Sequence, residues 1–166
     1  MAETKSASYL KGLRVLAVDD EQDILDTIED VLDAAQVDQA KDYDSASQKL
    51  KETKYDLAIL DIMGVNGLVL LAEAAVRGIP TVMLTAHSLN PPSLKDSIQK
   101  GAISYLPKEE LSKLDEFLSE VLDIHKRGES TWKHLFQRLG NFFDKAFGQN
   151  WMNDDQDFWN NYYRYM

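Results

Sequence analysis

Two short apolar runs in this chain each end on acidic residues. The run LRVLAV is followed by Asp19 and Asp20, and the run LAIL is followed by Asp61. Runs that are apolar at nearly every position are typical of strands buried on both faces of a parallel sheet. Because parallel strands bring their carboxyl ends to one edge of the sheet, we expect the three acids to share one site at that edge.

Strand and helix patterns alternate along the first 126 residues. The expected strands are residues 13–18, 37–41, 57–60, 79–86 and 102–106. The expected helices are residues 21–35, 45–53, 67–78, 91–101 and 109–125. Five strand–helix pairs predict an α/β fold with a doubly wound, five-stranded parallel sheet. Thr85 would end the fourth strand and Lys108 would follow the fifth, so both would face the crevice that holds the acids.

The composition narrows the class of protein. The 166 residues are enough for one hydrophobic core, and the absence of cysteine favours a reducing compartment. The first residues lack a secretory signal, and no apolar stretch approaches the roughly 20 residues that span a bilayer, so we expect a cytoplasmic protein. A net charge of −10 argues against nucleic-acid binding, which needs clustered cations.

Three carboxylates in one crevice repel one another, so a cation is expected between them. Oxygen ligands suit Mg²⁺, which would keep Asp61 ionised as a nucleophile and neutralise an incoming phosphoryl group. Lys108 and Thr85 would supply a charge and a hydroxyl donor for the phosphoryl oxygens. Taken alone, Asp19 and Asp20 also fit the N-terminal cap of the next helix, and Thr85 also fits an ordinary strand position.

Four segments in order, VLAVDDE, LAILD, VMLTAH and SYLPK, resemble the signature segments of the receiver domains of bacterial response regulators in two-component signalling. The resemblance covers about residues 12–126. It implies a flavodoxin-like receiver fold for residues 1–126. It also implies a switch, not an enzyme, that accepts a phosphoryl group on Asp61 from a sensor histidine kinase or a phosphotransfer protein.

The same resemblance implies a ligand set for Mg²⁺. Asp20 and Asp61 would bind the ion directly, together with the carbonyl of Met63, and Asp19 would act through a metal-bound water. The loop after Asp61 reads IMGVNG, which is shorter than is usual in the family and has no proline. We therefore expect the loop that supplies the Met63 carbonyl to be altered.

The remaining residues of the site are also assigned by resemblance. Thr85 and Lys108 would bind the phosphoryl group, and Tyr105 would be the switch aromatic whose ring turns inward when Thr85 is drawn to the phosphate. The family usually has a proline after a cis peptide bond where this chain has Glu109. A cis bond before any other residue costs about 2.5–4 kcal/mol, so we expect a trans bond and a displaced Lys108.

Two other functions fit parts of the pattern. A pseudo-receiver would keep the fold as an interaction module that no longer uses phosphate, which the shortened loop favours. Hydrolases of the haloacid dehalogenase type also combine an aspartate nucleophile with Mg²⁺, threonine and lysine. They carry a second aspartate two residues after the nucleophile, whereas here Met63 follows Asp61 at that spacing and Glu21 follows Asp19.

Residues 127–166 form a second expected unit, a helical and aromatic-rich extension. Ser130 or Thr131 and Gly148 would bound its main helix, and a second short helical segment would start near residue 153. The main helix carries one apolar stripe, which consists of Trp132, Leu135, Phe136, Leu139, Phe143 and Phe147. We expect the stripe to build an isologous homodimer or to dock a protein partner; packing on its own receiver domain and membrane binding are the alternatives. The length leaves no room for a winged-helix output domain.

Overall fold

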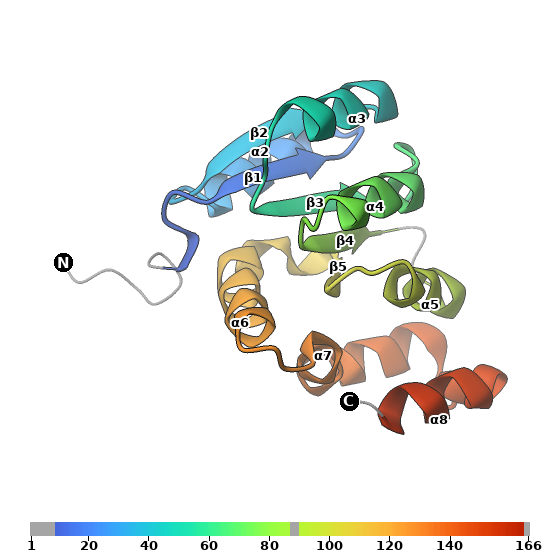
Figure 1. Cartoon of the computed structure of the whole chain (residues 1–166). Helices are drawn as coiled ribbons and strands as arrows, with labels where there is room; N and C mark the ends of the chain where they lie inside the picture. Colours follow the sequence, from blue (N-terminus) through green and yellow to red (C-terminus); the bar gives the residue numbers. More distant parts are fainter. Residues whose placement is uncertain (1–8, 87–89, 165–166) are drawn as a thin grey trace.

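The structure is a computed structural model that describes the backbone of residues 9–86 and 90–164. It has the predicted α/β fold with a helical C-terminal extension (Figure 1). The strands are β1 (Arg14–Val18), β2 (Gln36–Ala40), β3 (Leu57–Asp61), β4 (Thr81–Thr85) and β5 (Ser104–Pro107). The α-helices are α2 (Gln22–Val31), α3 (Tyr43–Glu52), α4 (Gly67–Val76), α5 (Pro91–Gln99), α6 (Leu114–Lys126), α7 (Thr131–Phe147) and α8 (Gln156–Arg164). Two 3-10 helices are η1 (Lys108–Lys113) and η2 (Trp151–Asp155).

The strands form one parallel sheet in the order β2-β1-β3-β4-β5. The order changes direction at β1, which pairs with β2 on one side and with β3 on the other. At such a point the helices that follow the two neighbouring strands, here α2 after β1 and α4 after β3, leave toward opposite faces of the sheet. A crevice therefore opens between the carboxyl ends of β1 and β3. Because β1 ends at Val18 and β3 ends at Asp61, the acids that follow or end these strands lie at this crevice.

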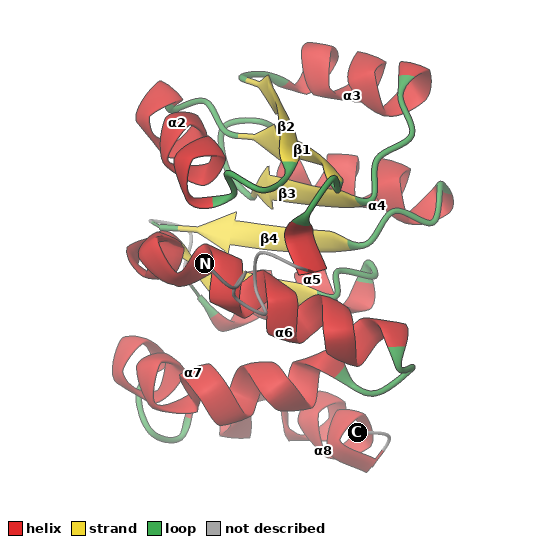
Figure 2. Ribbon diagram, turned by 90° about the vertical axis from the view of Figure 1, so that its left-hand side faces the viewer, coloured by secondary structure: helices red, strands yellow, loops and turns green. Residues whose placement is uncertain are grey.

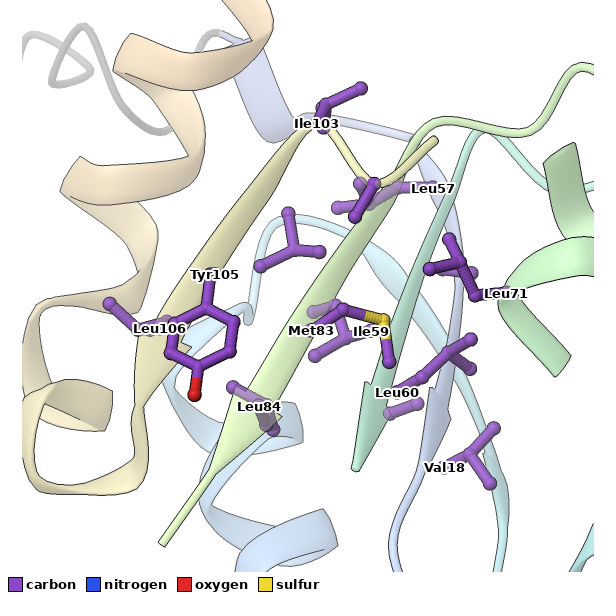
Figure 3. Packing of buried hydrophobic residues seen from close by; sticks show 14 of the residues in the cluster. Val18, Leu57, Ile59, Leu60, Leu71, Met83, Leu84, Ile103, Tyr105 and Leu106 are labelled. Atoms are coloured by element: carbon purple, nitrogen blue, oxygen red, sulfur yellow. The ribbon is translucent and has the colours of Figure 1, made fainter. Parts of the chain in front are cut away.

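Helices cover both faces of the sheet (Figure 2). α2 and α6 contact each other on one face, and α3, α4 and α5 form a row on the other. Every residue of β3 and β4 is buried, which is the physical reason for their apolar runs, Leu57–Leu60 and Val82–Leu84. Figure 3 shows Ile59, Leu60 and Met83 within this core, with Tyr105 on the edge strand β5.

Two helix boundaries differ from the expected ones by more than two residues. The helix expected over residues 21–35 ends at Val31, because the chain then turns and the Gln36 N–H donates to the Leu13 carbonyl (2.8 Å) to begin β2. The helix expected over residues 109–125 begins as the 3-10 helix η1 and becomes α-helical at Leu114. Neither change moves the strand ends that place the site. Among the described residues, no helix is long and apolar enough to cross a bilayer.

The C-terminal extension packs on the α/β part of its own chain. α7 contacts β5 and α6, while residues of η2 and α8 lie against α5 (Figure 1). α7 has the predicted ends: the Ser130 side chain accepts a hydrogen bond from the Lys133 N–H (3.3 Å), and Gly148 follows the last turn with φ of 92°.

The apolar stripe of α7 is covered by its own chain, so it does not offer the free surface that was expected to pair with a second copy; the homodimer and the protein partner stay predictions. Leu135 and Phe143 have no exposed surface, and Phe136 is partly buried against the same core. Trp151 and Trp159, from η2 and α8, pack on Phe136 from the other side. The second helical segment therefore covers the stripe instead of adding to the exposed aromatic surface, and the self-docked alternative is the arrangement found.

Polar contacts fix the docked extension. The Trp132 indole N–H donates to the Ala102 carbonyl, which precedes β5 (3.1 Å). Glu120 Oε2 of α6 accepts a hydrogen bond from Arg138 Nη1 (2.6 Å) and lies 2.7 Å from His134 Nε2. A purely apolar stripe could shift along β5 and α6. Hydrogen bonds require defined distances and angles, so these contacts fix α7 in one position.

Candidate functional site

The acids that were predicted to share a site do so around the amino group of Lys108. Lys108 Nζ lies 2.8 Å from Asp19 Oδ2 and 3.3 Å from Asp61 Oδ1, with Glu21 Oε1 at 4.0 Å. Lys108 directly follows β5, and its side chain reaches across the sheet edge to β1 and β3. The described chain has no cis peptide bond, so the bond to Glu109 is trans as expected. The expected displacement of Lys108 is wrong, since its amino group reaches both carboxylates.

Asp19 and Asp20 lie differently although they are neighbours. Asp19 is fully buried, and its Oδ1 accepts a hydrogen bond from the Glu21 N–H (2.9 Å). Asp20 is exposed and lines the cavity of the site. The alternative in which these acids cap the next helix is wrong, because the N-cap of α2 is Glu21 and no side chain caps that helix.

A small cavity opens at the carboxyl ends of β1 and β3. Its volume is about 170 Å³. It is lined by Asp20, Glu21, Asp61, Met63, Gly64, Ala86 and Lys108. Asp61 is only 5% exposed, so a reactant reaches its carboxylate through this cavity.

The loop after Asp61 closes tightly because it contains two glycines. Gly64 has φ of 83°, and a Cβ at this position would lie 2.7 Å from Asp20 Oδ2. A Cβ on Gly67 would lie 1.9 Å from the Asp61 carbonyl oxygen. Between them Asn66 adopts the left-handed conformation. The short loop therefore brings its backbone against both acids, and sequence reasoning did not predict this role of Gly64.

The donor set of the cavity fits a hard divalent cation. One carboxylate oxygen each from Asp19, Asp20 and Glu21 lies within 4.8 Å of the others. With Asp61 the crevice holds four acidic side chains against the single charge of Lys108, and closely spaced carboxylates favour a bound cation. Sequence reasoning did not propose Glu21 for the site. Its position directly after Asp20 in VDDE could have indicated that it lies there.

Burial sets the acid–base properties of the site. Burial, with the charge of Asp19, raises the pKa of Asp61 to about 6, although Lys108 acts against the rise. Burial also raises the pKa of Asp19, against the opposing hydrogen bond from Lys108. Burial alone would lower the pKa of Lys108, but the hydrogen bond with Asp19 and the charge of Asp61 outweigh it and raise that pKa. Near neutral pH the lysine is charged, and Asp61 is mostly ionised.

The raised pKa of Asp61 predicts that the metal-free fold loses stability as the pH rises from about 4 to about 6. In this window the folded chain binds more protons at Asp61 than the unfolded chain, so the free energy of unfolding falls with pH. We expect Asp61→Asn to raise the free energy of unfolding by about 1–2 kcal/mol near neutral pH in EDTA, with little effect near pH 4. Urea unfolding of both proteins at both pH values measures this. The exposed Asp33→Asn is the control of equal charge, and an Asp61→Asn gain that is as large near pH 4 would contradict the prediction.

Thr85, which directly precedes Ala86 of the cavity, contacts Tyr105. Both are buried, and the Tyr105 hydroxyl contacts the side chains of Thr85 and Ser93, with Ser93 Oγ at 2.9 Å. Burial raises the pKa of Tyr105, so the phenol is neutral. Ala86, the residue after Thr85, lines the cavity itself. The predicted pair is thus in contact, with the ring of Tyr105 already inside the protein.

Comparisons with known proteins agree with this geometry. The family model of the response regulator receiver domain matches residues 15–119. The phosphate regulon transcriptional regulatory protein PhoB of Klebsiella pneumoniae is 39% identical over 103 residues, which cover 57% of this chain and 44% of PhoB. The two-component response regulator ARR12 of Arabidopsis thaliana is 32% identical over 146 residues, which cover 84% of this chain and 22% of that protein. The chain thus spans less than half the length of these curated relatives.

A solved structure matches about two thirds of this chain. The putative response regulator from Chloroflexus aurantiacus J-10-fl is 25% identical, with a TM-score of 0.60. The match covers 99% of that chain but 68% of this one. The match therefore leaves part of this chain without a counterpart in that structure.

Proposed function

This chain belongs to the response regulator receiver family, and we propose that it is a phosphorylation-dependent switch that accepts a phosphoryl group on Asp61. The observation that carries the proposal is the convergence of Asp61, the neighbouring acids and Lys108 Nζ at one small cavity. Receiver domains are signalling domains of two-component systems, so the expected donor is a phosphohistidine of a sensor kinase or of a phosphotransfer protein. The division into a receiver domain (1–126) and an extension (127–166) is part of the proposal.

The residues of the cavity divide the work of phosphoryl transfer. An oxygen of the Asp61 carboxylate attacks the phosphorus, an O–P bond forms, and the P–N bond to the donor imidazole breaks with its electron pair going to the imidazole. Lys108 Nζ, 3.3 Å from Asp61 Oδ1, stabilises charge on the transferred oxygens. Thr85 supplies a hydroxyl donor once the phosphoryl group is in place. Asp20, Asp61 and the Met63 carbonyl would hold Mg²⁺, with Asp19 acting through a bound water. The ion supplies further charge neutralisation.

Acetyl phosphate labelling of the full chain tests the proposal. We expect incorporation that needs Mg²⁺, is lost in EDTA, and maps to residue 61 after borohydride reduction and mass spectrometry. A folded protein that stays unlabelled with acetyl phosphate and also with histidine kinases would support the pseudo-receiver, whose basis is the short loop around Gly64. Steady release of phosphate from small phosphate esters would support the phosphohydrolase.

Asp20→Asn is expected to weaken Mg²⁺ binding more than Asp19→Asn. Asp20 faces the cavity, whereas Asp19 is buried and its two oxygens already contact Lys108 and the Glu21 N–H. We expect a loss of about 10-fold or more for Asp20→Asn, as for removal of a direct ligand. Isothermal titration with Mg²⁺ at neutral pH compares the two. Equal affinities in two folded variants would contradict the assignment.

A further inference from the structure

The extension packs on Tyr105, whose hydroxyl contacts Thr85, the residue before Ala86 of the acidic cavity. The ring of Phe143, from α7, lies against the ring of Tyr105, with centroids 6.0 Å apart. The Tyr105 hydroxyl contacts Ser93 of α5 and Thr85, which ends β4 beside the cavity. Tyr105 has no exposed surface. A single buried residue therefore connects the extension to a residue proposed to bind the phosphoryl group.

The direction of the hydrogen bonds follows from the number of hydrogens. Ser93 Oγ donates to the Asn90 carbonyl (2.9 Å), so its one hydrogen is used. Tyr105 must then donate to Ser93 Oγ, and Thr85 is left as the donor to Tyr105. To donate to a phosphoryl oxygen instead, Thr85 has to withdraw its only hydroxyl hydrogen from Tyr105.

A second contact ties the extension to the helix that carries Ser93. Lys95 of α5 forms an ion pair with Asp155 of η2, and its Nζ lies 4.9 Å from the ring centroid of Phe158. The extension thus contacts the ring of Tyr105 directly and, through Lys95, the helix that carries Ser93. A shift of Tyr105 or of α5 would disturb the docked extension.

We propose that residues 130–164 form a latch on the α5–β5–α6 face, and that docking of the latch competes with phosphoryl occupation of the acidic site. This rests on the proposed function of Asp61. In the docked state Thr85 donates to Tyr105, and in the occupied state it donates to the phosphoryl group. Losing one hydrogen bond to a buried hydroxyl weakens docking by roughly 2- to 10-fold. Because such coupling is reciprocal, docking weakens binding at the site by the same factor.

The chain contains its own reporter of the latch. All three tryptophans, Trp132, Trp151 and Trp159, lie in the extension, and they are 7%, 5% and 3% exposed. Beryllofluoride with Mg²⁺, a mimic of the phosphoryl group, is added to the full chain, and acrylamide quenching of tryptophan fluorescence is measured. Fluorine NMR measures bound beryllofluoride independently. We expect quenching to increase as the bound fluorine signal appears.

Two variants of the full chain test the reverse direction. Asp155→Asn removes the ion pair with Lys95, and Tyr105→Phe removes the hydroxyl that holds Thr85 while keeping the ring against Phe143. We expect both to bind beryllofluoride roughly 2- to 10-fold more tightly, and Tyr105→Phe to lose the quenching response. The exposed Asp157→Asn carries the same charge change and should bind as the unaltered protein does.

The outcomes separate the latch from the proposed function. Absence of a bound fluorine signal in the unaltered protein would overturn the function of the site, and the latch with it. A bound signal without a change in quenching, together with unchanged affinity in Asp155→Asn, would overturn the latch alone. Reduced quenching with weaker binding in Asp155→Asn would also overturn it, since docking and occupation would then assist each other.

Discussion

Asp61→Asn is expected to reduce phosphoryl incorporation from acetyl phosphate by about 10³-fold or more, to the background of the assay. Asparagine keeps the shape of the side chain but replaces the anionic nucleophile with a neutral amide, which does not attack phosphorus. Asp61 lines the cavity and pairs with Lys108, whereas Asp19, the other acid close to Lys108 Nζ, is fully buried and accepts a hydrogen bond from the Glu21 N–H, so we do not expect Asp19 to take its place. Gel autoradiography with radiolabelled acetyl phosphate measures the loss.

The loss of label in Asp61→Asn should not come from unfolding. The same variant is expected to gain stability near neutral pH, because the charge that burial disfavours has been removed. Loss of label together with a higher urea midpoint would therefore show that Asp61→Asn is folded and has lost only the phosphoryl acceptor. Asp33→Asn, which changes an exposed acid just after the C-terminal end of α2, should label as the unaltered protein does. Label that is acid-labile and hydroxylamine-sensitive on folded Asp61→Asn would mean that another residue is the acceptor.

The place of the site could be predicted from sequence because a strand that is buried on both faces is apolar at nearly every position. LAILD showed both a buried strand and the acid at its end, and parallel topology then placed Asp61 beside the acids that follow β1. The contact of Lys108 with these acids was predicted as membership of one crevice. The position of the Lys108 amino group between Asp19 and Asp61 was not predicted, because a flexible side chain can compensate for a changed backbone after β5.

The cover of the C-terminal stripe could not be predicted in the same way. Helical spacing from Trp132 to Phe147 indicates that one face of α7 is buried, but it does not indicate which surface buries it. The structure places Phe143 on Tyr105 and closes the other side with Trp151 and Trp159. Likewise, the role of Gly64 depends on the distance to Asp20, which lies far away in the sequence.

Phe143→Ala is expected to lower the free energy of unfolding by about 3–5 kcal/mol, the usual cost of removing a fully buried phenylalanine. The side chain has no exposed surface. Its ring contacts Tyr105 of the sheet as well as the rings of Phe136, Phe147 and Trp151 within the extension. The truncation therefore leaves a cavity where the extension packs on the sheet.

The two parts of the chain should report this truncation differently. In the unaltered protein, tryptophan fluorescence follows the extension alone and far-UV circular dichroism follows the whole chain, and a shared core predicts that the two urea transitions coincide. In Phe143→Ala the fluorescence transition should move to lower urea and precede the circular dichroism transition, because the extension loses its main contact with Tyr105 first. Phe142→Ala removes a neighbouring ring that is only partly buried, and it should cost about 1 kcal/mol without separating the transitions. If Phe143→Ala cost no more than Phe142→Ala, the extension would not be held by this core, because a fully buried ring in contact with the sheet cannot be removed without leaving a cavity.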